Sequence, residues 1–390
     1  MIKIKKSRFV VIIVAVIIGT LLVATAGFFA VAKINDFTVV KASSYEKMKT
    51  ISKDYSKLYA LQTEINDNGL WKVSKTKQMN AIYKGLFNSL DDQYSTYMTK
   101  SEAKEWNSYV NGTFYGIGIS YEKYGKNKYI IRKVFSDSPA QSAGLKRGDI
   151  ILKVNGKVYT DVEKVKSAMR GKEGSRVKVT YSRKSAVKTV IMTRAEITED
   201  SVFSSVLKGN IGYIWISSFS ENTADEFKTE LKSMENKNVK GLVIDIRQNG
   251  GGYTQQGIKI ADMLLPECTI TYVKDRNGKK TYYNSKESCT KLKYVLLVDK
   301  NTASTSEILA SAIKDNNGGK LVGTTTFGKG IIQEEYTFKD GSAFKLTIQQ
   351  YFSPKGHKIH KIGVKPDYKV NLKSGSTTDY QLKKAMQLLK

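Results

Sequence analysis

A run of 24 residues, from Phe9 to Ala32, carries no charged side chain. As an α-helix this run would be about 36 Å long, enough to cross a hydrocarbon core of about 30 Å with some tilt. Four basic residues precede it: Lys3, Lys5, Lys6 and Arg8. Such residues stay on the cytoplasmic side of a membrane. The pattern therefore predicts a cytoplasmic stub, a membrane span over residues 9–32, and an exported chain after Lys33.

Two other interpretations of the run are weaker. A buried core helix is disfavoured because the uncharged run is long and follows a basic cluster. A cleavable signal peptide is the closer alternative, since residues 24–26 (Ala-Thr-Ala) resemble a cleavage site. The apolar run continues beyond those residues, which favours an uncleaved anchor.

The charge balance narrows the choice of partners. Lys and Arg number 64 and Asp and Glu 36, so the net charge is +28. An exported chain is a poor candidate for binding nucleic acid. An anionic envelope or membrane surface explains the charge about as well as a lysine-rich, solvated surface does. Two Cys and two His exclude Cys-rich zinc modules, and we expect no metal and no cofactor.

Residues 36–112 have helical periodicity. Thr99 and Glu102 form a capping-box pattern at the start of a helix that contains Trp106. The apolar faces of these helices suit an intramolecular core, with a homodimer contact as the alternative. We see no chemical signature in this region.

Residues 113–197 are predicted to form a small β-rich domain with helices. Three segments, 115–119 (Tyr-Gly-Ile-Gly-Ile), 138–145 and 147–156, resemble a PDZ domain. The resemblance implies that backbone N–H groups at the first glycine loop capture the C-terminal carboxylate of a peptide. The residues of that loop are Gly116, Ile117, Gly118 and Ile119; an ordinary tight turn is the alternative. Arg170, at the end of the second helix, is a candidate regulatory relay, although a solvated helix-end arginine is the simpler interpretation.

Residues 198–390 alternate between strands and helices, which predicts an α/β core with a mostly parallel sheet and a C-terminal helix. The loops after buried strands are the places to look for chemistry. Three stand out: residues 247–252 (Arg-Gln-Asn-Gly-Gly-Gly), 299–307 and 324–330. In the second loop, Ser304 stands between a strand and a helix, as a nucleophile would.

A serine nucleophile needs a base. Both histidines lie in a Lys-rich stretch, which predicts that they are surface residues and not that base. Lys329 lies between two glycines in an otherwise uncharged stretch. A lysine serves as a base when burial lowers its pKa. From the residues alone, Ser304 and Lys329 are a candidate pair, and the alternative is a helix-capping serine and a solvated lysine, which are the commoner roles at such positions.

Residues 240–333 resemble the carboxyl-terminal processing protease family, which uses a Ser–Lys dyad. The motifs are residues 241–252, 302–310 and 326–333, and the similarity extends to residues 91–97, the PDZ segment and residues 363–367. By motif position the resemblance implies Ser304 as nucleophile, Lys329 as general base and Gln333 as the residue that orients it. It also implies oxyanion donors at the backbone N–H groups of Gly251 and Thr305.

Two positions depart from the family pattern. The family usually has Asn-Pro-Gly-Gly where this chain has Asn249-Gly250-Gly251-Gly252, and Asp-Asp-Pro-Tyr where it has Asp91-Asp92-Gln93-Tyr94. Loss of a proline makes a loop more flexible. The preorganisation of the oxyanion hole is therefore in doubt, and the nucleophile is not.

Cys268 and Cys289 flank a segment that predicts a hairpin around Asn277-Gly278. A two-residue turn there would pair residue 268 with residue 287, one diagonal step from Cys289. We therefore expect a disulfide, with two unrelated thiols as the alternative.

The sequence predicts a single-pass membrane protein with an extracytoplasmic serine endopeptidase. Its expected parts are a stub and anchor (1–35), a helical region (36–112), a PDZ domain that captures the free C-termini of protein or peptide substrates (113–197) and the protease core (198–390). A catalytically inactive peptide-binding PDZ scaffold of the same fold is the alternative, and an envelope-binding structural protein is a third interpretation.

Overall fold

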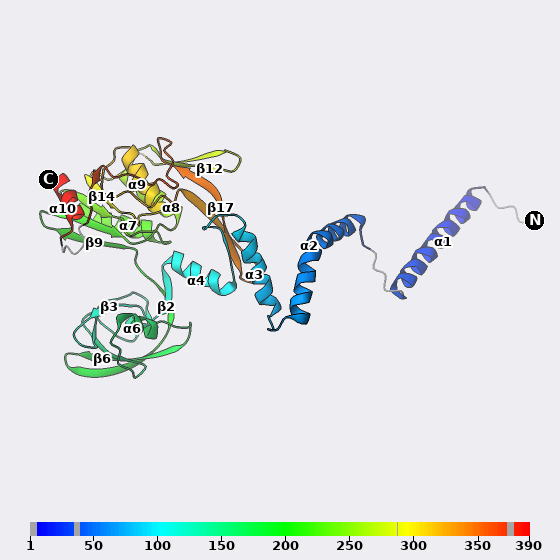
Figure 1. The fold of residues 1–390 in the computed structure, drawn as a ribbon, viewed down its shortest axis with the longest axis horizontal. Helices are drawn as coiled ribbons and strands as arrows, with labels where there is room; N and C mark the ends of the chain where they lie inside the picture. Colours follow the sequence, from blue (N-terminus) through cyan, green and yellow to red (C-terminus); the bar gives the residue numbers. More distant parts are fainter. Residues whose placement is uncertain (1–5, 35–39, 287, 373–377) are drawn as a thin grey trace, which may run out of the picture. The chain divides into compact units, whose positions relative to one another are not determined.

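The computed structural model describes residues 6–34, 40–286, 288–372 and 378–390. The chain divides into two compact units, the first ending at Ile82 and the second beginning at Tyr83. The first unit contains α1 (Lys6–Ile34), α2 (Ala42–Asn68) and the first half of α3 (Lys75–Asn88). Helix α1 is long and apolar enough to be a membrane span or a signal peptide (Figure 1).

Helix α4 (Lys100–Asn111) lies in the second unit and begins at the predicted capping box. Thr99 accepts a hydrogen bond from the backbone N–H of Glu102, whose carboxylate accepts one from the backbone N–H of Thr99 in return. The capping box is thus confirmed.

The PDZ segment forms one antiparallel sheet in the order β3-β4-β5-β6-β7. Its strands are β3 (Ile119–Lys123), β4 (Tyr129–Val134), β5 (Ile150–Val154), β6 (Arg176–Arg183) and β7 (Ala186–Thr193), with α5 (Pro139–Ser142) and α6 (Val162–Met169). A ribbon of β2 (Thr113–Gly116) and β8 (Ala195–Thr198) leads into and out of this sheet. Strand β3 is at the edge, where a peptide can add as a further strand.

A six-stranded sheet forms the centre of the core, in the order β18-β15-β14-β11-β10-β9. Its strands are β9 (Val202–Leu207), β10 (Ile211–Ile216), β11 (Leu242–Asp245), β14 (Tyr294–Val298), β15 (Lys320–Gly323) and β18 (Tyr368–Lys369). Only β9 pairs antiparallel in this sheet; the other neighbours are parallel. Alternate residues of each strand point to opposite faces of the sheet. Both faces are apolar because helices cover both of them.

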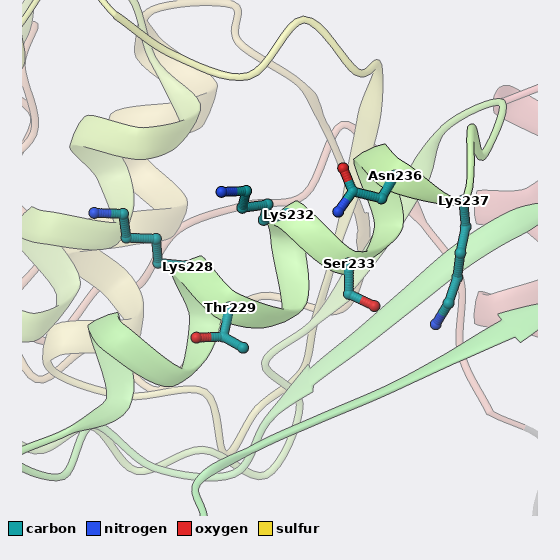
Figure 2. A pocket seen from close by; sticks show the side chains of 6 residues that line it. All are labelled: Lys228, Thr229, Lys232, Ser233, Asn236 and Lys237. Carbon is teal, nitrogen blue, oxygen red and sulfur yellow. The ribbon is translucent and has the colours of Figure 1, made fainter.

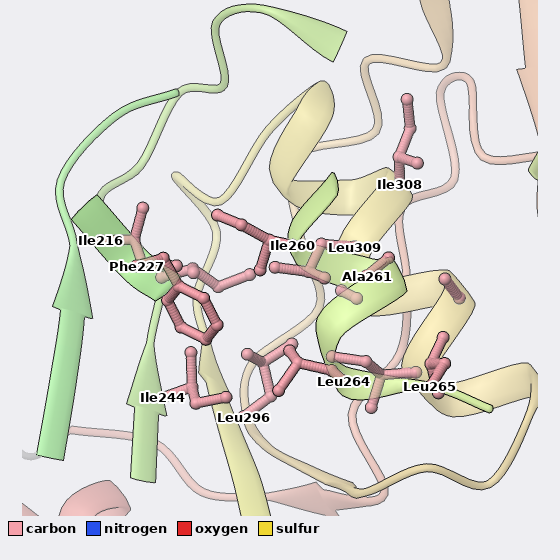
Figure 3. Close-up of a cluster of buried hydrophobic side chains, with 14 of the residues drawn as sticks. Ile216, Phe227, Ile244, Ile260, Ala261, Leu264, Leu265, Leu296, Ile308 and Leu309 are labelled. Carbon is pink, nitrogen blue, oxygen red and sulfur yellow. The ribbon is translucent and has the colours of Figure 1, made fainter. Parts of the chain in front are cut away.

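One face packs against α7 (Thr223–Asn236), α8 (Thr254–Leu264) and α9 (Thr305–Asp315). Figure 3 shows part of this cluster, where Phe227 lies beside Ile216, Ile244 and Leu296, all fully buried. The other face packs against α10 (Tyr380–Leu388) through Val243, Leu297 and Ala385. Arg247 ties α10 to the core, because its guanidinium binds both Asp245 and Asp379.

The second sheet of the core is antiparallel throughout, so the expected mostly parallel sheet describes only the central one. Strand β17 (Ala343–Phe352) pairs with β16 (Ile331–Thr337), with β12 (Thr269–Asp275), which in turn pairs with β13 (Lys280–Asn284), and with β1 (Thr96–Met98). The pairing of β1 with β17 brings a segment that precedes the PDZ domain into the core. The helical periodicity predicted for residues 36–112 did not reveal this three-residue strand.

The predicted register of the β12–β13 hairpin is wrong. Lys274 pairs with Lys280, so the loop is longer than two residues, and a bulge follows Thr269. Cys268 therefore lies opposite Ser285, whose N–H donates to its carbonyl, and not opposite residue 287, which lies outside the described residues. Cys268 and Cys289 are both free thiols in the structure, and the expected disulfide is not formed.

Candidate active site

Three loops meet at one edge of the central sheet. The loops at residues 246–253, 299–304 and 324–330 follow β11, β14 and β15, which are parallel neighbours in the sheet. Carboxyl ends of adjacent parallel strands lie at the same edge. The sequence had singled out these three loops, and the sheet order explains why they come together.

Ser304 has a strained backbone. Its φ is 58° and its ψ is −120°, immediately before the first residue of α9. An ordinary N-cap residue is extended, and a positive φ is uncommon for a residue with a Cβ. Sharp, strained strand-to-helix turns present nucleophilic serines in hydrolases. The conformation thus favours a chemical role over simple capping.

The buried carboxylate of Glu307 joins the serine loop to the lysine loop. One oxygen accepts hydrogen bonds from the backbone N–H of Ser304, at 2.9 Å, and of Lys329, at 2.8 Å. The other accepts from the Thr326 hydroxyl and the Gly328 N–H. Burial raises the pKa of Glu307, and these four donors oppose that shift. Glu307 therefore ties the two loops together through hydrogen bonds to both of them.

Lys329 lines the same cleft as Ser304. Burial lowers the pKa of Lys329 to about 8, and the positive charge of Lys345 adds to the effect. The carboxylates of Asp92 and Glu307 oppose it. In the described part of the chain no hydrogen bond joins the Lys329 amine to the Ser304 hydroxyl, so the structure shows a shared cleft and not a formed proton-transfer contact.

Gln333 lies on β16 and also lines the cleft. Its side-chain amide donates a 3.0 Å hydrogen bond to the hydroxyl of Thr347 on β17. Among the described residues it makes no hydrogen bond to Lys329. The structure places Gln333 at the cleft but does not show it orienting the lysine.

The two expected oxyanion donors lie close together. A Cβ at Gly251, where φ is +101°, would be 2.8 Å from Ser304 Cβ and 3.1 Å from Thr305 N, so only glycine fits here. The N–H of Gly251 donates to the side-chain oxygen of Asn249 at 2.8 Å. Within the described residues the N–H of Thr305 has no such acceptor, which leaves one N–H directly available to an oxyanion.

The cleft has a volume of about 970 Å³. It brings together residues from the serine, lysine and glycine loops, from α4, from β16 and from the PDZ segment: Trp106, Arg170, Gly251, Ser304, Lys329 and Gln333. A separate shallow hollow on the outer side of α7 is lined by lysines and small polar residues and holds none of these side chains (Figure 2).

A second cavity, of about 630 Å³, lies between β3 and α6 in the PDZ domain. The predicted peptide-binding residues Gly116, Ile117, Gly118 and Ile119 line it, as does Met169. Arg170 lines both this groove and the cleft, with its guanidinium over the Phe114 ring at 4.1 Å and 3.5 Å from Glu199.

Sequence reasoning missed Tyr94 and the cleft position of Trp106. The Lys329 amine lies over the Tyr94 ring, and the Trp106 indole N–H donates to Glu335 on β16. The similarity of residues 91–97 to the family pattern was the available signal, but no chemistry could be attached to it.

The sequence matches two family models and resembles known proteases. The model of peptidase family S41 matches residues 210–370 and the PDZ domain model matches residues 116–193. A probable CtpA-like serine protease of Staphylococcus haemolyticus is 34% identical over 376 residues, which cover 95% of this chain and 73% of that protein. The carboxy-terminal processing protease CtpA of Bacillus subtilis is 36% identical over 324 residues, covering 82% and 69%.

A solved structure shows the same fold. The putative S41 protease of Bacteroides fragilis superimposes with a TM-score of 0.52 at 17% identity and covers 82% of this chain and 92% of that one. These matches define a serine peptidase of family S41 with a PDZ domain. The chain belongs to the carboxy-terminal processing protease family.

We expect Glu307→Gln to weaken both the fold and the activity. The glutamine nitrogen cannot accept a hydrogen bond, so buried donors on the two loops are left unpaired, each costing about 1–3 kcal/mol. Urea unfolding and peptidase assays of the purified full chain measure the two effects. The exposed Glu267→Gln is the matched control, and an unchanged Glu307→Gln protein would contradict the role given to this carboxylate.

Proposed function

We propose that this protein is a membrane-anchored, extracytoplasmic endopeptidase that cleaves peptide bonds with a Ser304–Lys329 dyad. One observation carries the proposal: a serine in a strained strand-to-helix turn shares a cleft with a lysine whose pKa is lowered by burial, and one buried carboxylate holds both loops. Neither histidine lines that cleft in the described part of the chain.

In the proposed mechanism Ser304 Oγ attacks the carbonyl carbon of the scissile bond while the neutral amine of Lys329 takes the hydroxyl proton. The negative charge on the carbonyl oxygen is stabilised by the Thr305 N–H and, once it is released from Asn249, by the Gly251 N–H. The Lys329 ammonium then gives its proton to the leaving amine. Water hydrolyses the acyl-enzyme by the same route, and Gln333 orients the lysine.

The proposed location follows from the N-terminal helix and its flanking charges. Basic residues precede α1, so the positive-inside rule exports the chain that follows it. The substrates are then proteins or peptides outside the cytoplasm with free C-termini, which the PDZ groove captures beside β3. The catalytically inactive scaffold is the alternative, and the presence of Ser304, Lys329 and Gln333 speaks against it.

We propose that peptide binding in the PDZ groove also activates the protease. Arg170 is the candidate relay because it lines both the groove and the cleft. Such control requires the peptide to bind one arrangement of the catalytic loops better than another. The flexible run of glycines at residues 250–252 is an element that such binding can order.

Ser304→Ala and Lys329→Ala are each expected to reduce cleavage of an unstructured protein by at least about ten-thousandfold, because both partners of the dyad are needed for the same step. Gln333→Ala, which transfers no proton, is expected to cost up to about a hundredfold. Ser233→Ala and Lys237→Ala, which change residues of the separate hollow on α7 and not of the cleft, are the controls. Near-normal turnover by Lys329→Ala would exclude the dyad.

The pH dependence follows from the need for a neutral Lys329. Below its pKa of about 8 the amine is protonated and cannot accept a proton. We therefore expect kcat/KM to fall about tenfold per pH unit below that value and to level off above it. Initial rates with a peptide substrate between pH 5 and pH 9.5 test this expectation, and a rate that rises steadily toward acid would contradict it.

Gating can be separated from simple tethering with a short peptide that has a free C-terminal carboxylate, its amidated twin and a reporter substrate that does not use the PDZ groove. We expect the free-acid peptide to raise reporter turnover by about fivefold or more, the amidated one much less, and Arg170→Ala to remove the difference. Equal effects of the two peptides, or none, would leave the PDZ domain as a tether.

A further inference from the structure

The segment from Asp92 to Met98, which precedes the PDZ domain in the chain, lies beside the lysine loop and is fixed there by hydrogen bonds. The carboxylate of Asp92 accepts hydrogen bonds from the Tyr94 N–H, at 3.0 Å, and from the Ser95 hydroxyl, at 2.6 Å. The Ser95 hydroxyl accepts in turn from the Thr347 N–H of β17 at 2.9 Å. Strand β1 begins at the next residue, Thr96, and pairs with β17. Tyr94 is therefore held on both sides.

The Tyr94 ring faces the amine of Lys329. The distance from the Lys329 Nζ to the ring centroid is 4.9 Å, within the range at which an ammonium interacts favourably with an aromatic face. Tyr94 lines a cavity shared with Phe327 and Gly328, whereas Lys329 lines the cleft that holds Ser304. The ring thus contacts the lysine without occupying the substrate cleft.

We infer that Tyr94 is a positioning residue for Lys329, whose ring face stabilises the ammonium that forms when the serine is deprotonated. The inference rests on the proposed dyad. As the bond from Ser304 Oγ to the carbonyl carbon forms, its proton moves to the Lys329 nitrogen, and it leaves later with the amine product. The ring has its largest effect while that proton is on the nitrogen, which is when the barrier is crossed.

The charged groups around the Lys329 amine both repel and attract its positive charge, and the Tyr94 ring adds a neutral contact that favours it. Lys345 on β17, whose own amine lies over the Trp106 ring at 3.6 Å, repels the ammonium, and burial also disfavours it. Asp92 in the turn and Glu307 on α9 are the carboxylates that attract it. Glu307 already accepts four hydrogen bonds, and Asp92 holds the turn. A neutral ring favours the cation at short range without adding a third carboxylate that would keep the resting lysine protonated.

This arrangement has a consequence for the extent of the catalytic unit. The region matched by the peptidase family model begins at residue 210 and does not include Tyr94. If the ring contributes to the chemistry, the unit that performs proteolysis includes the segment before the PDZ domain, and the PDZ domain lies in the chain between two parts of one site.

The test compares Tyr94→Phe, Tyr94→Leu and progressively fluorinated phenylalanines at position 94 in the full chain, measuring kcat and kcat/KM against pH. Fluorination weakens the negative ring face with little change in shape, so it remains informative if Tyr94→Leu fails to fold. Tyr368, whose ring lies 4.6 Å from the Lys384 amine, is the matched control contact, since neither residue lines the cleft or the cavity beside Tyr94. The same substitutions there should leave kcat unchanged.

We expect Tyr94→Phe to stay within about twofold of the parent protein and Tyr94→Leu to lose about three- to thirtyfold in kcat. Loss of the ring face also lowers the pKa of Lys329, so the acidic limb of kcat/KM should move to lower pH by about half a unit or more. The fluorinated series should lower kcat in the order of fluorine content.

Three outcomes would overturn the inference: an equal loss in Tyr94→Phe and Tyr94→Leu, which would assign the effect to the hydroxyl; an unmoved acidic limb in a folded Tyr94→Leu protein; or no trend with fluorination. Retained activity in Ser304→Ala or Lys329→Ala would instead refute the dyad itself. The two failures are therefore distinguishable.

Discussion

The buried carboxylate of Glu307 is the interaction on which the site depends. Its two oxygens receive hydrogen bonds from the backbones of Ser304, Gly328 and Lys329 and from the Thr326 hydroxyl. Such a group is costly to bury, and it is stable here because all of its accepting capacity is used. The serine turn and the lysine loop come from different strands, and Glu307 joins them together with two further links. The Tyr351 hydroxyl contacts the carbonyl oxygens of Ser304 and Lys329, and the Phe327 N–H donates to the Thr302 carbonyl.

In the proposed mechanism the Lys329 amine meets two opposing requirements. It must be neutral to accept the proton of Ser304, and it must then carry a positive charge until that proton passes to the leaving amine. Burial and Lys345 favour the neutral form, while carboxylates and an aromatic face lie where they can support the cation. These groups come from α9, β17 and the segment before the PDZ domain, so the electrostatic balance depends on the whole catalytic unit.

The proposed activation by peptide binding rests on the part of the PDZ domain that adjoins the cleft. The ribbon of β2 and β8 leads into and out of the domain, and Arg170, at the end of α6, lines both the peptide groove and the cleft. In the proposed activation, a change in the groove therefore reaches the cleft through Arg170, which lines both. The glycine loop beside Ser304 lacks the proline that is usual in the family, and hydrogen bonds to Gly251 and Gly252 hold it in place.

The local patterns of the sequence determined the long apolar N-terminal helix, the Thr99 capping box, the β-rich PDZ segment and the three loops after apolar strands, because side-chain periodicity and turn chemistry act over a few residues. The tertiary structure alone decided the antiparallel second sheet, the register of the β12–β13 hairpin and the arrival of Tyr94 beside Lys329. Residues 94 and 329 are far apart in the sequence. They come together because β1, which follows Tyr94, and β16, which follows Lys329, both pair with β17. Long-range pairing of that kind leaves no periodic signal in the chain, so only the folded molecule reveals it.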